Sequence, residues 1–148
     1  ERFDLTFKNK NNQDERPVMI HRAPFGSLER FVAILIEHTA GFFPMWLTTN
    51  QLMIISVGEK HEKFAKKVLN ILEKAEIRAT LDNRNETVGK KIHESEVNKV
   101  PFMGIIGDRE VNNNTVTIRE CGGKDVGEMN INDLINFIKK EEIKSLSN

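Results

Sequence analysis

Two short, largely apolar runs restrict the fold of this chain more than any other feature of its sequence. They are Leu52–Val57 and Phe102–Ile106, and neither alternates regularly between apolar and polar residues. Runs of this kind are typical of strands that are buried on both faces, as in a parallel sheet. Apolar spacing predicts the remaining elements, which are helices over about 60–75, 87–98 and 132–144 and strands over 77–81 and 115–119. This alternation predicts an α/β fold, with a mixed, mostly parallel sheet of about five strands and helices on both faces.

The beginning of the chain has a different pattern, which predicts two strands and a helix. Apolar and polar residues alternate over 2–7, a polar loop follows, and an apolar strand is predicted over 17–23. The next apolar spacing predicts a helix over about 27–39, which Gly41 ends. Two strands and one helix bury too little apolar surface to be stable alone, so this segment is expected to be the remnant of a larger sheet. The predicted domains are residues 1–47 and residues 48–148.

The composition is that of a globular protein without a strong preference for nucleic acid. Hydrophobic residues make up 39% of the chain and charged residues 30%, and no apolar run approaches the ~20 residues that span a bilayer. The single cysteine, Cys121, and the charged start favour a cytoplasmic protein. Twenty-two basic residues balance 22 acidic ones, which argues weakly against binding mainly through phosphates. It does not exclude a protein that reads a few splayed bases by stacking and hydrogen bonding.

Several segments resemble the class II aminoacyl-tRNA synthetases, and in detail the threonyl branch of that class. Ile20–Ala23 and Gly26–Phe31 are similar to motif 3 of the class. The similarity continues along most of the chain, through 40–47, 82–86, 100–103, 107–111 and Arg119. The resemblance implies the C-terminal part of a threonine–tRNA ligase. It would contain the end of the catalytic antiparallel sheet, followed by the anticodon-binding domain.

The resemblance implies roles in the catalytic site for three residues near the motif 3 segment. His21 corresponds to a zinc ligand, and the other ligands would lie outside this chain, so the chain alone is expected to hold zinc weakly or not at all. By itself, one histidine in a strand is more often a satisfied polar residue. Arg30 corresponds to the arginine that contacts ATP, although an ion pair with Glu29 or Asp4 is the alternative. Ser27 corresponds to a residue of the threonine pocket and is also a good helix N-cap.

The resemblance also implies that Asn85, Glu110 and Arg119 read anticodon bases. All three are expected at strand ends, where open α/β sheets bind ligands. Their amide, carboxylate and guanidinium groups match the edges of bases. The alternatives are a helix cap for Asn85, at the end of its turn, and a surface ion pair between Glu110 and Arg119. Glu110 is expected just before a turn formed by residues 112–114.

Four basic side chains are expected to contact the RNA backbone: Lys90, Lys91, Lys99 and His93. His93 stands where the family commonly has arginine and would be mostly neutral at pH 7, which predicts weaker or pH-dependent binding. Thr49 stands where the family usually has proline, a change that touches no chemistry.

The whole enzyme implied by the resemblance would use ATP, Mg²⁺ and threonine to charge tRNA(Thr), and would be a homodimer. Motifs 1 and 2 are not found in this sequence, so the chain alone is expected to be inactive. No membrane or DNA partner is expected. One alternative is a non-catalytic RNA- or protein-binding module with the same α/β fold. Another is the anticodon domain of a glycyl or prolyl synthetase, which would not be expected to have the zinc histidine.

Overall fold

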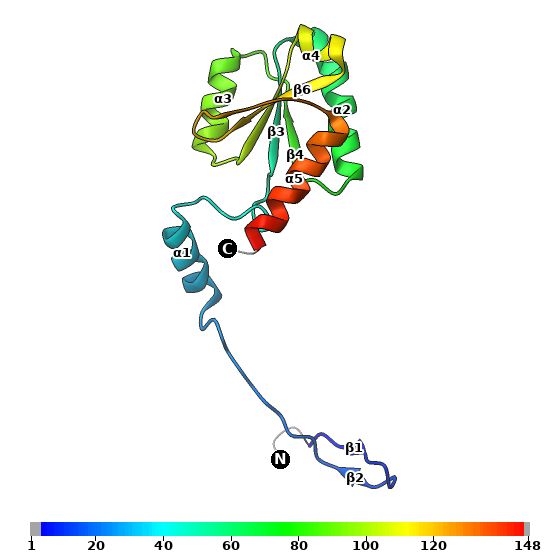
Figure 1. The fold of residues 1–148 in the computed structure, drawn as a ribbon. Coiled ribbons are helices and arrows are strands. Elements are labelled where there is room, and N and C mark those ends of the chain that lie inside the picture. Colours follow the sequence, from blue (N-terminus) through cyan, green and yellow to red (C-terminus); the bar gives the residue numbers. More distant parts are fainter. Residues whose placement is uncertain (1–3, 147–148) are drawn as a thin grey trace. The chain divides into compact units, whose positions relative to one another are not determined.

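The computed structural model describes residues 4–146, and the chain divides into two compact units, Glu1–Leu35 and Ile36–Asn148 (Figure 1). The first unit contains a short antiparallel hairpin, formed by β1 (Phe7–Lys8) and β2 (Asp14–Glu15). The side-chain oxygen of Asn9 accepts the backbone N–H groups of Asn11 and Gln13 and so stabilises the loop of this hairpin.

The two strands predicted at the start of the chain are not formed as expected. The first two residues of the predicted strand 2–7 lie outside the described residues, and of the others only Phe7 belongs to a strand. The predicted strand 17–23 is wrong, since this segment has no regular structure and Val18 is 90% exposed. A strand needs a neighbour to pair its backbone groups, and none of the described strands lies beside this segment.

Helix α1 (Leu28–Thr39) confirms the helix predicted over about 27–39. The carbonyl oxygen of Ser27 accepts the N–H of Phe31 at 3.0 Å, so Ser27 occupies the N-cap position. The helix ends where Ala40 and Gly41 adopt positive φ angles of 50° and 79°. The N–H of Gly41 then bonds back to the carbonyl of Ile36, as in the common glycine-terminated helix end.

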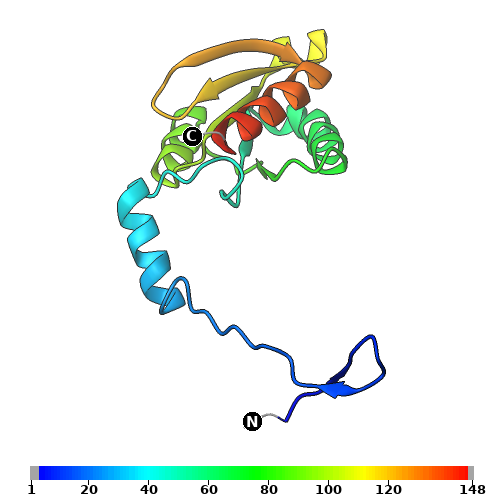
Figure 2. The ribbon, with the colours of Figure 1, turned by 60° about the horizontal axis from the view of Figure 1, so that its bottom comes forward.

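The second unit is an α/β domain whose described residues form a mixed sheet in the order β4-β3-β5-β6-β7 (Figure 1). Its strands are β3 (Leu52–Ser56), β4 (Ala79–Asp82), β5 (Phe102–Ile106), β6 (Thr115–Glu120) and β7 (Asp125–Asn130). Both β4 and β5 pair with β3 in parallel, whereas β6 and β7 pair antiparallel with the strand before them. Figure 2 shows β6 and β7, in gold and orange, side by side along one edge of the sheet. The predicted mixed α/β fold is confirmed.

Helices cover both faces of this sheet, as expected. They are η1 (Glu59–His61), α2 (Glu62–Lys74), α3 (Val88–Val97), α4 (Asp108–Asn113) and α5 (Ile131–Leu146). In Figure 1, α3 lies on one side of the sheet and α2 and α5 lie on the other. Leu52, Ile54 and Phe102 pack into the core on the side of α2 and α5. Alternation along the strands places Met103 and Arg119, which are paired across β5 and β6, on the opposite face.

The core leaves no room beside Gly104, in the middle of β5. A Cβ atom on this residue would lie 2.9 Å from Cγ1 of Val116, on the neighbouring strand. Val116 is itself completely buried. Glycine is therefore required here by close packing between two strands.

Two elements of this unit differ from the sequence-based expectation. The segment before the expected turn at 112–114 is the short helix α4, and the left-handed residue Asn114 (φ 58°, ψ 42°) ends it. Strand β7 had no predicted range, because glycines were expected to interrupt the chain there. Gly127 instead lies within β7 with a φ of 119°, opposite Ile118 and next to an irregularity in the pairing. No helix among the described residues has the length and apolar character needed to cross a membrane.

Candidate nucleic-acid interface

Asn85 lies in an exposed turn between β4 and α3, with its side chain free. The N-cap of α3 is Thr87, whose hydroxyl accepts the N–H of Lys90 at 3.3 Å. The helix-cap alternative for Asn85 is therefore wrong. Within residues 4–146 the structure gives the side-chain amide of Asn85 no hydrogen-bond partner, so its donors and acceptor remain available to a ligand.

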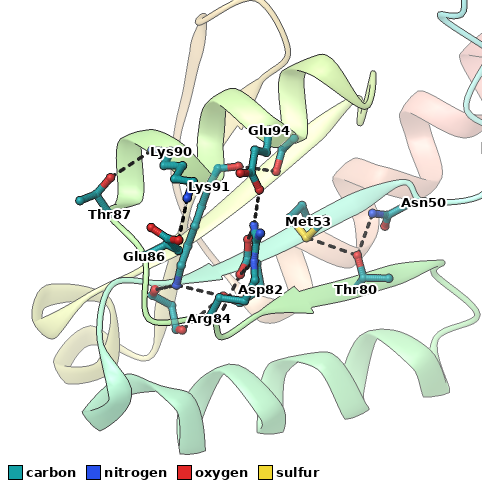
Figure 3. Close-up of polar contacts among 12 residues, drawn as sticks. Asn50, Met53, Thr80, Asp82, Arg84, Glu86, Thr87, Lys90, Lys91 and Glu94 are labelled. Atoms are coloured by element: carbon teal, nitrogen blue, oxygen red, sulfur yellow. Dashed lines mark hydrogen bonds and ion pairs between the residues drawn. The ribbon is translucent and has the colours of Figure 1, made fainter.

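The turn that carries Asn85 is held by a charged cluster that Figure 3 shows in detail. Arg84 donates two hydrogen bonds to Asp82, from Nε at 3.0 Å and from its terminal nitrogen at 2.6 Å. The same terminal nitrogen lies 2.5 Å from Oε2 of Glu94, on α3. Hydrogen bonds from Arg84 lower the pKa of Asp82, and the two carboxylates raise the pKa of Arg84 above its ordinary value.

Lys91 is buried, which corrects its expected contact with the RNA backbone. Only 1% of the residue is exposed, and Nζ donates to the carbonyl oxygens of Ser56 at 2.8 Å and Asp82 at 3.3 Å. These carbonyls belong to the last residues of β3 and β4, so the lysine binds the carboxyl ends of two parallel strands (Figure 3). Its neighbour Lys90 is exposed, but its ammonium group is paired at 2.6 Å with Glu86, which raises the pKa of Lys90.

Glu110, in α4, has both carboxylate oxygens engaged inside the domain. Oε2 accepts the N–H of Gly107 at 2.9 Å, and Oε1 accepts the hydroxyl of Thr117 at 2.8 Å. Partial burial alone would raise the pKa of Glu110, but hydrogen bonds from Thr117, Gly107 and its own N–H together lower it. The alternative of an ion pair with Arg119 is not seen among the ion pairs of the described residues. An oxygen that accepts one hydrogen bond can still accept another from a base.

Arg119 lies in β6 and has an unused guanidinium group. Its Nε is buried without a hydrogen-bond partner among the described residues, and none of their ion pairs involves it. A Cβ atom on Gly123 would lie 3.1 Å from a terminal nitrogen of Arg119, so glycine leaves space for the side chain. An arginine whose guanidinium is unpaired within the domain is suited to bind a base or phosphate.

The three expected base-reading residues do not lie at the same end of the sheet's strands. Asn85 and Glu110 follow the carboxyl ends of β4 and β5. Arg119 pairs with Met103, the second residue of β5, because β6 runs antiparallel to β5. Thr117, which binds Glu110, shares a face of β6 with Arg119. Arg119 therefore lies near the end of the sheet opposite to the one that Asn85 and Glu110 follow.

The last two candidates for backbone contact are both exposed. His93 lies on the outer surface of α3. Lys99 follows α3 with a φ of 57°, and its Nζ lies 4.2 Å from the centre of the Phe42 ring. A cation over an aromatic face in this geometry is a weak contact that RNA can displace.

His21, Ser27 and Arg30 belong to the first unit, where each is exposed. Ser27 donates to Glu29 at 2.6 Å and Asp4 pairs with Arg16 at 2.8 Å, and neither carboxylate forms an ion pair with Arg30 among the described residues. No three histidine, cysteine or acidic side chains gather among the described residues in a way that would hold a metal ion. The described residues therefore do not by themselves form a zinc site around His21.

Sequence reasoning missed the charged cluster of Asp82, Arg84 and Glu94. The signal was present, since an aspartate two residues before an arginine, next to Asn83 and Asn85, is typical of a turn fixed by its own side chains. Nothing in the sequence pattern indicated that Glu94, on the helix that follows the turn, completes the cluster.

A second missed cluster fixes the segment that leads into the sheet. Arg78 donates to the carbonyl oxygens of Thr48 at 2.9 Å and Met45 at 2.7 Å, and lies 3.3 Å from Glu142 of α5. Gln51 is 1% exposed and bonds to the Met45 carbonyl, to Glu142 and to the N–H of Arg78. The clasp formed by Arg78, Gln51 and Glu142 thus ties residues 45–48 to β3 and α5.

Comparison with known proteins assigns this architecture to a family. Residues 51–141 match the model of the anticodon binding domain, and residues 1–39 match the class II tRNA synthetase core domain (G, H, P, S and T). The chain belongs to the family of anticodon-binding domains, joined to the end of a class II synthetase core.

Within that class, the chain belongs to the threonyl branch. It is 55% identical over 145 residues to the threonine–tRNA ligase of Flavobacterium johnsoniae, covering 97% of this chain and 22% of that protein. Identity to the Bacteroides fragilis enzyme is 48% over all 148 residues, which cover 23% of that protein. The chain therefore spans less than a quarter of the length of these relatives. Among solved structures, the RNA binding domain of threonyl-tRNA synthetase from Cryptosporidium parvum has a TM-score of 0.75 and 33% identity, over 95% of this chain and 36% of that one.

Proposed function

We propose that this chain is the anticodon-reading part of a threonine–tRNA ligase and recognises tRNA(Thr). The observation that carries the proposal is the half-buried guanidinium of Arg119, positioned but unpaired on the sheet face that also holds Thr117 and, through it, Glu110. Asn85 adds a free amide beside the end of β4. Together these groups offer donors and acceptors for the edges of unpaired bases.

The complete enzyme would join threonine to tRNA(Thr) with ATP and Mg²⁺, and this chain would contribute Arg30 to the ATP contact and Ser27 to the threonine pocket. His21 would supply one ligand to a zinc site whose remaining ligands come from other parts of the enzyme. A homodimeric, cytoplasmic parent protein is part of the same proposal. The chain alone would form no threonyl-adenylate, and measurable threonine-dependent pyrophosphate exchange by the chain would contradict this point.

Binding of the 148-residue chain to an anticodon stem–loop of tRNA(Thr) tests the proposal. The comparison hairpin has the second and third anticodon bases exchanged. Asn85→Ala and Arg119→Ala should each reduce the preference for the correct hairpin by about 5- to 150-fold, the range for a lost base contact. Asn112→Ala is the matched control, because Asn112 is also an exposed asparagine of this domain. Equal binding of both hairpins by the unaltered chain would contradict base reading and favour a general interaction module.

A further inference from the structure

The turn from Asp82 to Thr87 is fixed on both sides of Asn85 but not through Asn85 itself. Before it, the backbone N–H of Arg84 donates to Oδ1 of Asp82 at 3.1 Å. After it, the N–H of Glu86 donates to the carbonyl of Arg84 at 2.9 Å. Within the described part of the chain, the side chain of Asn85 has no hydrogen bond of its own. Its direction is therefore set by the residues beside it.

Arg84 connects this turn to two different elements. Its guanidinium group binds Asp82, at the end of β4, through both Nε and a terminal nitrogen. It also reaches Glu94 on α3, at 2.5 Å (Figure 3). Asp82 is 8% exposed, so the partner of the guanidinium group is itself firmly placed in the domain. The side chain spans the turn from strand to helix, and the turn cannot shift relative to either element without breaking a charged hydrogen bond.

The same contacts make Arg84 a poor candidate for holding a phosphate. Two carboxylates neutralise its charge within hydrogen-bond distance, and Lys90 is likewise paired with Glu86. A phosphate would have to displace one of these carboxylates or approach against their negative charge. The two neighbours therefore differ, since Arg84 is paired with two carboxylates whereas the side chain of Asn85 has no hydrogen-bond partner among the described residues.

We propose that Arg84 is a positioning residue for base recognition: by bridging Asp82 and Glu94 it fixes the turn that presents Asn85 to an anticodon base. The inference rests on the proposed role of Asn85 and adds the residue on which that role depends. Fixing a recognition group in its bound geometry avoids the entropy cost of ordering it on binding. The discrimination contributed by Asn85 should then depend on Arg84, although Arg84 touches no base.

Stem–loop binding by the 148-residue chain tests this role, with each anticodon base replaced singly. Asn85→Ala identifies the base that Asn85 reads, as the one whose discrimination falls by about tenfold. Arg84→Ala should reduce discrimination at that same base and leave the others unchanged. In the double variant, discrimination should fall no further than about twofold below that of Asn85→Ala, because coupled residues are not additive.

Conservative variants separate positioning from direct RNA contact. Arg84→Lys keeps the charge but loses the guanidinium group, so it should behave like Arg84→Ala if the residue positions Asn85, and like the unaltered chain if it binds phosphate. If Arg84 positions Asn85, Glu94→Gln should weaken discrimination at the same base. If Arg84 instead binds phosphate, removing the negative charge of Glu94 would strengthen RNA binding. Loss of a phosphate contact would also make the negative slope of log K against log salt less steep, by about 0.7. Lys144→Ala is the control, because it removes an exposed, carboxylate-paired cation from α5.

The outcomes distinguish failure of this inference from failure of the proposed function. If Asn85→Ala leaves the discrimination between anticodon bases unchanged, the proposed role of Asn85 is wrong, and so is the role of Arg84 that rests on it. If Asn85→Ala has its effect but Arg84→Ala matches the unaltered chain, only the positioning role is overturned. A measurement without RNA gives an independent check. NMR order parameters of residues 83–86 should fall in Arg84→Ala from about 0.85 toward 0.6, and unchanged values would overturn the inference.

Discussion

The amino group of Lys91 donates a 2.8 Å hydrogen bond to the carbonyl oxygen of Ser56, the last residue of β3. Its second bond, to the carbonyl of Asp82, reaches the last residue of β4. The carbonyl groups at the ends of two parallel strands are thereby bound by a single side chain from α3, and the Asp82 carbonyl also accepts the hydroxyl of Ser56 at 3.4 Å. This buried cation holds the helix onto the edge of the sheet from which the turn of Asn85 begins.

Lys91→Met should destabilise the domain by about 2–4 kcal/mol, because the Ser56 carbonyl would lose this donor, the Asp82 carbonyl would keep only the 3.4 Å bond from the Ser56 hydroxyl, and Asp82 would lose a nearby positive charge. Urea unfolding measures the change in the free energy of unfolding. Lys90→Met is the matched control, and since this exposed pair with Glu86 contributes little, its effect should be much smaller than that of Lys91→Met. Equal effects of the two substitutions would show that the burial of Lys91 is not a source of stability.

Two glycine-to-alanine substitutions should have opposite effects. Gly104→Ala places a methyl group 2.9 Å from Val116 in the sheet core, and should cost about 1–3 kcal/mol of stability. Gly89→Ala adds a methyl group in open space within α3, and should stabilise the domain by about 1 kcal/mol through helix propensity. Thermal unfolding of both variants checks the pair. An unchanged melting temperature for Gly104→Ala would mean that β5 and β6 separate more easily than the packing indicates.

Arg78→Ala should release the segment that enters the second unit. The carbonyl of Thr48 would lose its donor, that of Met45 would keep only the bond from Gln51, and Glu142 would lose one of its two partners. Amide hydrogen exchange over residues 44–50 should therefore become faster, while exchange in β5 stays unchanged. Arg78→Lys should restore little of the protection, because an ammonium group cannot reproduce the fork. Protection equal to that of the unaltered chain would show that the clasp is held by Gln51 alone.

Glu128 should make the link between α4 and β7 sensitive to acid. Hydrogen bonds from Thr115, Arg109 and Asn113 lower the pKa of Glu128 from 4.5 to about 2. Since the folded pKa is below the unfolded one, this contribution to stability is present above about pH 4.5 and is lost as the pH falls toward about 2. The difference in melting temperature between the unaltered chain and Glu128→Gln should shrink over this interval. A difference that is constant with pH would contradict the lowered pKa.

Elements with a continuous apolar signal were predictable from the sequence almost to the residue. Strand β5 has the predicted bounds, and α3 begins and ends within one residue of the predicted helix. Helix α4 escaped prediction because six residues are too few for a helical period to appear. Strand β7 escaped because glycine lies within it and its residues are at most half-buried.

The candidate site was predictable in residue type but not in local environment. The side chains of Asn85 and Arg119 have no hydrogen-bond or ion-pair partner among the described residues, as base-reading residues would need, but no spacing in the sequence encodes this. Lys91 was misjudged because a lysine in a charged helix is normally solvated, and only its position facing the ends of β3 and β4 buries it. The strand expected over 17–23 failed for a related reason, since pairing depends on a neighbouring strand and not on the apolar run alone.

The placement of β3 between β4 and β5 has a consequence for how the domain folds. Strands β3 and β4 are joined through α2, and β5, β6 and β7 follow one another with only the short helix α4 between β5 and β6, so contacts within each group are close along the chain. The pairing of Leu52 with Phe102 joins the two groups and closes a loop that contains α2, β4 and α3. Closing a long loop costs entropy before its contacts form, so we expect this pairing to limit the folding rate. Because that cost grows slowly with loop length, residues inserted in the turn after β4 would slow folding only slightly, whereas a weakened β3–β5 interface would slow it strongly.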